Sequence, residues 1–182
     1  DSMVQIKYMS KTLTDFRNFL KPSTKKVLFS ISKALNEINE IIGKQVFYSN
    51  INMNFNYKNK NEELLIYGYE NEFKQVLLNI INNAKNKIVE KNLPLNKKGE
   101  ININIQRCEN CNMIEIIDDA GAIDEKIINS IFEPYFTTKE NGMGLGLYMA
   151  KIIIEDKMKG TISVRNDKNC VIFTIKLPFK KA

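Results

Sequence analysis

The chain has 182 residues, of which 43% are hydrophobic and 26% are charged, a composition typical of a single globular domain that folds in water. Its net charge of +6 comes from scattered lysines, with no block of basic residues interleaved with aromatic ones, so we expect no nucleic-acid partner. No apolar stretch is long enough to cross a membrane and no secretory signal opens the chain, which predicts a cytoplasmic domain, although a longer parent protein could be membrane-anchored.

Apolar residues near the N-terminus repeat in alternating steps of three and four, at Ile6, Met9, Leu13, Phe16 and Leu20. This spacing predicts a helix over residues 3–20 with a packing stripe. Pro22 cannot continue a helix and therefore ends it. The stripe fits a partner helix in a coiled coil, and it equally fits an amphipathic helix docked on a core.

The rest of the chain alternates between strand-like and helix-like patterns. We predict strands at about 27–31, 45–51, 63–67, 100–107, 112–117, 160–166 and 170–177. We predict helices at about 32–43, ending at Gly43, and at 70–91, 124–130 and 146–158. Because strands alternate with helices but also form hairpins, the pattern predicts an α+β fold, a two-layer α/β sandwich with a mixed sheet.

The predicted helix 70–91 carries three asparagines, Asn79, Asn83 and Asn86, in a narrow stripe beside its apolar face. Asparagine is a mediocre helix former, so three on one line need a reason. They form either a solvated face in an asparagine-rich protein or the polar edge of a ligand cavity. An amide oxygen is a hard, uncharged ligand that suits Mg²⁺ bridged to phosphates. The adjacent Lys87 could also reach a phosphate.

The predicted strand 112–117 runs directly into Asp118 and Asp119. A buried carboxylate at a strand end can accept a hydrogen bond from the amino group of adenine, and it repels the oxygen that guanine presents at the same place. The segment also reads as an acidic turn in which Asp124 caps the helix 124–130.

A glycine-rich segment at residues 142–147 leads directly into the predicted helix 146–158. Glycines let the backbone approach a phosphate, and the N-terminus of a helix offers free N–H donors. The segment is not a Walker loop, because no Lys-Ser/Thr follows, and no βαβ unit precedes it as a dinucleotide fingerprint would require.

An aromatic loop at residues 131–139 (IFEPYFTTK) precedes the glycines. It reads either as an ordinary anchored loop or as the base of a mobile lid. Thr137, Thr138 and Lys139 could contact a phosphate from this position.

The chain has three cysteines, Cys108 and Cys111 in a C-x-x-C pair and Cys170 apart from them. An odd number argues against a disulfide framework and fits a reducing compartment. A structural zinc site usually needs four ligands, and the chain has no histidine to complete one. Residues 107–113 also read as a hairpin turn with Glu109 and Asn110 at its tip.

Four segments are each weak signals alone but informative in their order and spacing: 79–84 (NIINNA), 118–123 (DDAGAI), 131–139 and 142–147 (GMGLGL). They resemble the N box, first glycine box, F box and second glycine box of sensor histidine kinases. The resemblance covers residues from about 26 to 178 and implies a Bergerat-type ATP-binding fold. It divides the chain into residues 1–22, similar to the second helix of the dimerisation and phosphoacceptor hairpin, and residues 23–182, the ATP-binding catalytic domain.

The resemblance also implies ATP and Mg²⁺ as cofactors and assigns roles to individual residues. Asn83 takes the place of the metal ligand, Asn79 the place of a catalytic residue that polarises groups near the terminal phosphate, and Asp118 the place of the adenine ligand. The implied cofactor-binding set is Asn79, Asn83, Asn86, Lys87, Asp118, Gly121, Ala122, Ile123, Thr137, Thr138, Lys139, Gly142, Met143, Gly144, Leu145, Gly146, Leu147 and Thr174.

By this resemblance the chain is part of a protein histidine kinase that transfers the γ-phosphoryl group of ATP to a histidine. The chain itself contains no histidine and so cannot phosphorylate itself. We therefore expect a fragment of a larger kinase. Its implied partners are ATP and ADP, the phosphoacceptor helix of the same kinase, a response regulator, and a second copy in a homodimer of the full-length protein.

The sequence departs from the family pattern Asp-x-Gly-x-Gly, because Ala120 and Ala122 stand in place of the two glycines. If the second position requires a positive φ, its methyl group costs about 1 kcal/mol or more and weakens nucleotide binding. One alternative is therefore a degenerate nucleotide-binding or docking module without kinase activity. Two further alternatives are a serine kinase of the anti-sigma-factor type and a basic nucleic-acid-binding protein.

Overall fold

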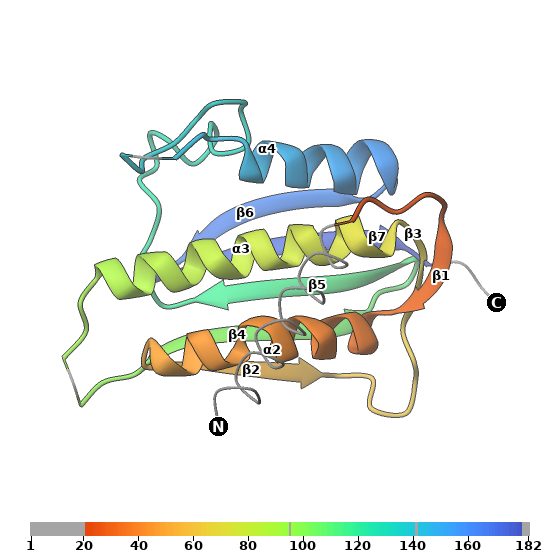
Figure 1. The fold of residues 1–182 in the computed structure, drawn as a ribbon, viewed down its shortest axis with the longest axis horizontal. Helices are drawn as coiled ribbons and strands as arrows, with labels where there is room; N and C mark the ends of the chain where they lie inside the picture. The colour runs from red at the N-terminus through yellow and green to blue at the C-terminus, as the bar shows by residue number, and fades with distance from the viewer. Residues whose placement is uncertain (1–20, 95, 141, 180–182) are drawn as a thin grey trace, which may run out of the picture.

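A computed structural model describes residues 21–94, 96–140 and 142–179. Its main feature is a five-stranded sheet in the order β2-β4-β5-β7-β6, with helices packed over one face (Figure 1). The strands are β2 (Ile51–Tyr57), β4 (Gly99–Arg107), β5 (Cys111–Asp118), β6 (Thr161–Asp167) and β7 (Cys170–Pro178). β2 runs parallel to β4, and the remaining pairings are antiparallel. The predicted two-layer α+β fold with a mixed sheet is confirmed.

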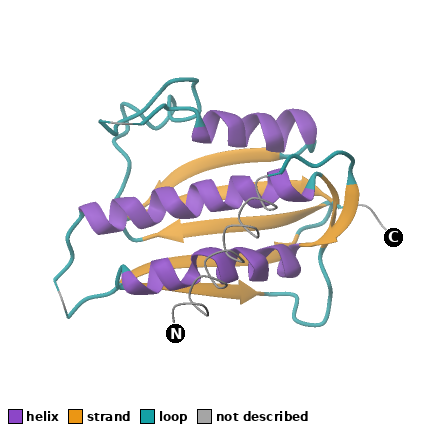
Figure 2. Ribbon diagram, viewed as in Figure 1, coloured by secondary structure: helices purple, strands orange, loops and turns teal. Residues whose placement is uncertain are grey.

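The helical layer lies over the apolar face of this sheet (Figure 2). Its members are α2 (Ile31–Tyr48), α3 (Glu70–Glu90) and α4 (Gly146–Lys151), the last continuing as a π-helical segment, η1 (Ile152–Lys157). Alternate residues of the central strands, such as Ile103 and Ile116, are fully buried beneath the helices. A separate antiparallel pair, β1 (Val27–Ser30) and β3 (Leu65–Gly68), flanks the helices. In the part of the chain that the structure covers, no helix is long and apolar enough to cross a membrane.

The second helix is longer than the sequence predicted. Gly43 does not end α2, which continues to Tyr48, so the predicted strand over residues 45–51 is wrong. A glycine inside a helix costs only about 1 kcal/mol, and the extension buries Val46 in the core. The chain turns instead at Asn50, whose φ of 58° leads directly into β2.

Residues 124–130 form turns rather than the predicted helix. The Asp124 side chain accepts a hydrogen bond from the Lys126 N–H at 2.9 Å, which closes a local turn instead of capping a helix. Asn166 on β6 holds the start of this segment, because its side chain accepts from the Ile123 N–H and donates to the Ile123 carbonyl. This tertiary contact overrides the local helical pattern.

The N-terminal end of α3 is capped by a residue 48 positions earlier in the chain. The Ser23 hydroxyl accepts a hydrogen bond from the Asn71 N–H at 3.2 Å, and the buried Glu72 carboxylate accepts one from the Ser23 N–H. This exchange is a capping box whose serine comes from a distant segment. Ser23 therefore ties the entry of the chain to α3. The helix predicted over residues 3–20 lies outside the described residues.

Candidate nucleotide-binding site

A cavity of about 310 Å³ lies between α3, the end of β5, the loop that precedes α4, and α4 itself. Most of the predicted site residues line it: Asn79, Asn83, Lys87, Asp118, Ile123, Thr137, Thr138, Lys139, Gly142, Met143, Gly144, Leu145, Gly146 and Leu147. They come from three regions that are far apart in the sequence, residues 79–87, 118–123 and 137–147. The fold therefore brings the four sequence boxes to one place.

The asparagines of α3 form the polar edge of this cavity. The Asn83 Oδ1 accepts a hydrogen bond from the Lys139 ammonium at 3.0 Å, so a cation already lies against this amide oxygen. The Nδ2 of Asn79 is buried and has no hydrogen-bond partner. A buried donor without a partner costs about 1–3 kcal/mol, and this one belongs to a residue that lines the cavity.

At the other end of the cavity, Asp118 is 4% exposed. Burial raises the pKa of its carboxyl from 3.8 to about 6, while the Ala120 N–H, Lys87 and Lys91 act in the opposite direction. The Ala120 N–H donates to the Asp118 Oδ1 at 3.1 Å. The neighbouring Asp119 points elsewhere, since its Oδ1 accepts from the Glu100 N–H at 2.9 Å. The strand end therefore aims one carboxyl group, and not two, into the cavity.

The turn after Asp118 accommodates the two alanines without a strained φ. Gly121 has a φ of +108°, whereas neither Ala120 nor Ala122 has a positive φ. The glycine between the two alanines thus takes the conformation that an L residue disfavours. Gly121 and Ala122 lie in the chain between Asp118 and Ile123, which line the cavity, but do not line it themselves.

The glycine loop is packed too closely to tolerate side chains at two positions. Gly144 has a φ of +66°, and a Cβ atom there would lie 2.6 Å from the Phe136 carbonyl oxygen. A Cβ atom at Gly146 would lie 2.6 Å from the Asn79 Oδ1. Gly144 therefore seats the loop on the aromatic segment, and Gly146 lets α4 approach α3.

Besides Gly121 and Ala122, two more predicted site residues do not line the cavity. Thr174 follows Phe173 on β7, and because successive strand residues face opposite sides of a sheet, it points to the open face. Asn86 is also off the lining. On α3 the residues Asn79, Asn83 and Lys87 line the cavity at intervals of four. Each interval turns the lining position by about 40° around the helix axis, which leaves Asn86 to one side.

Sequence reasoning missed the apolar wall of the cavity. Its members are Ala84, Ile127, Ile131, Phe136, Val171 and Phe173. The alternation of β7 signals that Val171 and Phe173 face the helices, but the neighbours of a strand residue depend on long-range packing. The wall gives the cavity an apolar body with polar groups at its edges, as small-ligand sites usually have.

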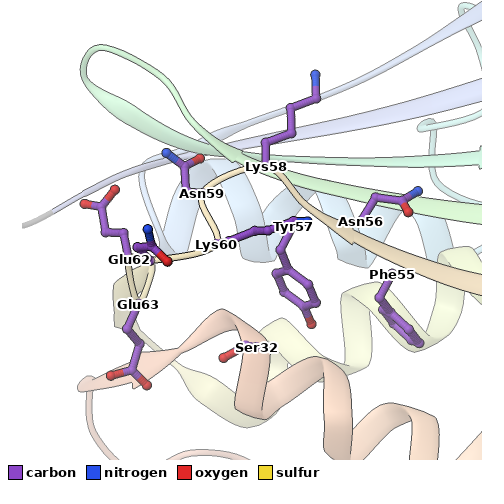
Figure 3. A pocket seen from close by; sticks show the side chains of 10 residues that line it. Ser32, Phe55, Asn56, Tyr57, Lys58, Asn59, Lys60, Glu62 and Glu63 are labelled. Carbon is purple, nitrogen blue, oxygen red and sulfur yellow. The ribbon is translucent and has the colours of Figure 1, made fainter.

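A larger hollow of about 870 Å³ lies at the end of β2 and along the loop of residues 58–63 (Figure 3). Tyr57 extends from β2 toward the first turn of α2, while Lys58 points away from it. The charged side chains there have both signs, and none of the predicted site residues lies there. This hollow is therefore not the candidate nucleotide site.

Comparison with known proteins decides the family. The profile of the "Histidine kinase-, DNA gyrase B-, and HSP90-like ATPase" family matches residues 68–181. The chain belongs to this ATPase family. Sporulation kinase A of Bacillus subtilis (strain 168) is 30% identical over 156 residues, which cover 85% of this chain and 24% of the relative. Sporulation kinase B of the same organism is 29% identical over 84% of this chain and 34% of its own length.

Solved structures of this ATPase family agree. The nucleotide-free catalytic domain of histidine kinase ThkA matches with a TM-score of 0.75 at 28% identity, covering 85% of this chain and 96% of that one. The chain is thus a histidine-kinase-type ATP-binding catalytic domain. It spans about a quarter to a third of the length of its curated relatives.

Proposed function

We propose that this ATPase-family domain is the catalytic part of a larger histidine kinase, in which it passes the γ-phosphoryl group of ATP to a histidine outside this chain. The observation that carries the proposal is the polarity of the cavity: buried Asp118 lies at one end, and Asn83, Lys139 and the glycine loop lie at the other. Adenine would donate its amino hydrogen to the Asp118 carboxylate. The phosphates would lie against the Lys139 ammonium and the N-terminus of α4.

Mg²⁺ fits the environment of Asn83. The Asn83 Oδ1 is a hard oxygen that already accepts from a cationic group, the Lys139 ammonium. When bound there, Mg²⁺ would neutralise part of the phosphate charge. Lys139 would then be free to donate to a phosphate oxygen, and the unpartnered Asn79 N–H would gain an acceptor.

The transfer step needs little covalent chemistry from this domain. An imidazole nitrogen of the acceptor bonds to the γ-phosphorus as the bond from that phosphorus to the bridging oxygen breaks, ADP leaves, and the imidazole gives up a proton. Catalysis is then mostly positioning and charge stabilisation. Asn79, Asn83 and Lys139 supply these by holding the phosphate end of ATP in one geometry.

A response regulator is the proposed downstream partner. ThkA, which shares this fold, is seen in complex with the response regulator protein TrrA, at a TM-score of 0.70 and 23% identity to this chain. The proposed homodimer would form through the parent protein's phosphoacceptor hairpin.

The test supplies the phosphoacceptor hairpin of the parent kinase in trans, with ATP and Mg²⁺. We expect acid-labile phosphate on the hairpin, as phosphohistidine gives. Asn83→Ala should lower the rate about tenfold or more, because it removes a ligand oxygen from the charged site, whereas Asn86→Ala on the same helix should leave it unchanged. Acid-stable phosphate on a serine would contradict the proposal, as would tight ATP binding without transfer.

A further inference from the structure

The C-x-x-C pair forms a thiol cluster at the tip of the β4–β5 hairpin. Arg107 pairs with Asn112 across the hairpin, so Cys108 and Cys111 are the next residues to face each other. The Cys108 N–H donates to the Cys111 carbonyl at 2.7 Å, and the side chain of Cys108 helps to raise the pKa of the Cys111 thiol. Both cysteines are free and partly exposed.

Neither the third cysteine nor a zinc site accounts for this pair. Cys170 lies at the other end of β7, where its neighbour Val171 pairs with Asp118, while Cys111 pairs with Pro178. The two ends of the eight-residue strand β5 are about 23 Å apart. Among the described residues, no three His, Cys, Asp or Glu side chains are grouped to hold a metal ion. The pair is therefore a two-sulfur site.

We propose that Cys108 and Cys111 form a reversible dithiol–disulfide couple, and that its state changes the conformation of the adjoining loop of residues 58–63. The oxidant is a small disulfide such as oxidised glutathione. One cysteine thiolate attacks it, forms a mixed disulfide and releases one glutathione thiolate. The second cysteine loses its proton, attacks the first cysteine sulfur and expels the second glutathione. Two protein thiols become one disulfide, and one oxidised glutathione becomes two reduced ones.

The hairpin geometry permits this bond. Cys108 and Cys111 are joined by one backbone hydrogen bond and lie one residue beyond the Arg107–Asn112 pair. Residues directly opposite each other on antiparallel strands have Cα atoms about 4.5–5.5 Å apart, within the range of about 4.4 to 6.8 Å that a disulfide spans. The Cys111 side chain points to the open face of the sheet, as the alternation along β5 requires, and Cys108, directly after β4, is also partly exposed. A small disulfide can therefore approach without any opening of the core.

The reaction should be slow at neutral pH. The pKa of Cys111 is raised to about 11. Burial is the largest cause, and the side chain of Cys108 acts in the same direction through hydrogen bonding and charge. Because the thiolate is the nucleophile, the rate of closure should rise with pH up to that value. We therefore expect closure at neutral pH to need sustained oxidation.

The residue next to Cys108 connects the pair to the loop. The Arg107 N–H donates to the Asn59 Oδ1 at 2.9 Å, and the Arg107 guanidinium pairs with Glu62 at 3.1 Å. These residues line or adjoin the hollow at the end of β2 shown in Figure 3. A change in hairpin twist on closure would act on both contacts, whereas Asp118 lies at the far end of β5.

The experiment uses the whole chain with Cys170→Ser as background, titrated with mixtures of oxidised and reduced glutathione. We expect the loss of both remaining thiols, a mass lower by two hydrogens, and recovery on reduction. Hydrogen exchange should change in residues 58–63, and ATP affinity should stay within about twofold, because distant sites without shared partners rarely couple. Cys108→Ser and Cys111→Ser should each abolish closure.

Three results would overturn the proposal. Separate glutathione adducts on the two cysteines would show that the ring does not close. Disulfide-linked dimers would show that the partners belong to different molecules. Unchanged exchange in residues 58–63 after complete closure would remove the coupling to the loop.

Discussion

Folding and nucleotide binding favour opposite protonation states of Asp118, because burial favours the neutral carboxyl and the proposed contact with adenine uses the carboxylate. Burial raises its pKa from 3.8 to about 6, so the folded state binds its proton more tightly than the unfolded state does. The stability that Asp118 contributes is therefore fully present below about pH 4 and is lost as the pH rises to about 6. A carboxylate held at pH 7 costs up to about 3 kcal/mol of folding free energy.

We predict that Asp118→Asn raises the free energy of unfolding at pH 7 by about 1–3 kcal/mol, because it removes this buried charge. Urea titrations from pH 3 to 8 should show no difference from the unsubstituted chain below about pH 4 and a constant difference above about pH 6. Asp119→Asn is the matched control, since its side chain holds the Glu100 N–H outside the cavity. A difference that grew as the pH fell would contradict the stated role of burial.

The unusual first glycine box should also affect stability. Gly121→Ala should lower stability by about 1 kcal/mol or more, because a φ of +108° disfavours a side chain although the space around it is open. Ala122→Gly, which restores the family pattern, should also lower stability by about 0.4–1 kcal/mol, because glycine raises the conformational entropy of the unfolded chain. Urea unfolding measures both. A gain in ATP affinity for Ala122→Gly would instead show that the alanine impairs the site.

Helix α3 links the entry of the chain to the nucleotide site. Its first turn is capped by Ser23, and its middle carries Asn79 and Asn83. The cap residue Tyr69 makes no side-chain capping bond of its own, so the distant serine does this work. A displacement of Ser23 would therefore act on the same helix that lines the cavity.

We predict that Ser23→Ala lowers the free energy of unfolding by about 1 kcal/mol, the usual value of a lost cap. Glu72→Ala should cost a similar amount or more, because it leaves the Ser23 N–H without its acceptor. The double variant should cost less than the sum of the two, since each half of the box depends on the other. Strictly additive losses in urea titrations would show that Ser23 and Glu72 act independently.

Across the whole molecule, sequence spacing was enough to predict the sheet class and most elements, and the family resemblance supplied most of the polar residues that line the cavity. Strong periodicity predicted α3, and glycine chemistry predicted the loop before α4. The apolar wall around Phe173, the Asn166 contact with Ile123 and the Ser23 cap were not predictable, because each depends on residues far apart in the chain. Thr174 was misplaced because the resemblance gave its strand but not its face.

The choice between a working and a degenerate site depended on a backbone conformation and on a long-range contact, neither of which the sequence shows. The sequence showed alanines where the family has glycines, and only backbone geometry shows that Gly121 takes the positive φ between them. The pairing of Asn83 with Lys139 likewise joins two boxes that are 56 residues apart. Both features favour an intact cavity for ATP.

Calorimetric titration tests most directly whether one cavity binds ATP between Asp118 and Asn83. ATP and ADP should be titrated, with and without Mg²⁺, into the unsubstituted chain, Asp118→Asn and Asp119→Asn. We predict saturable, adenine-selective binding that strengthens with Mg²⁺, falls about tenfold or more in Asp118→Asn, and is kept in Asp119→Asn. Absence of binding at millimolar nucleotide, or equal binding by all three proteins, would contradict it.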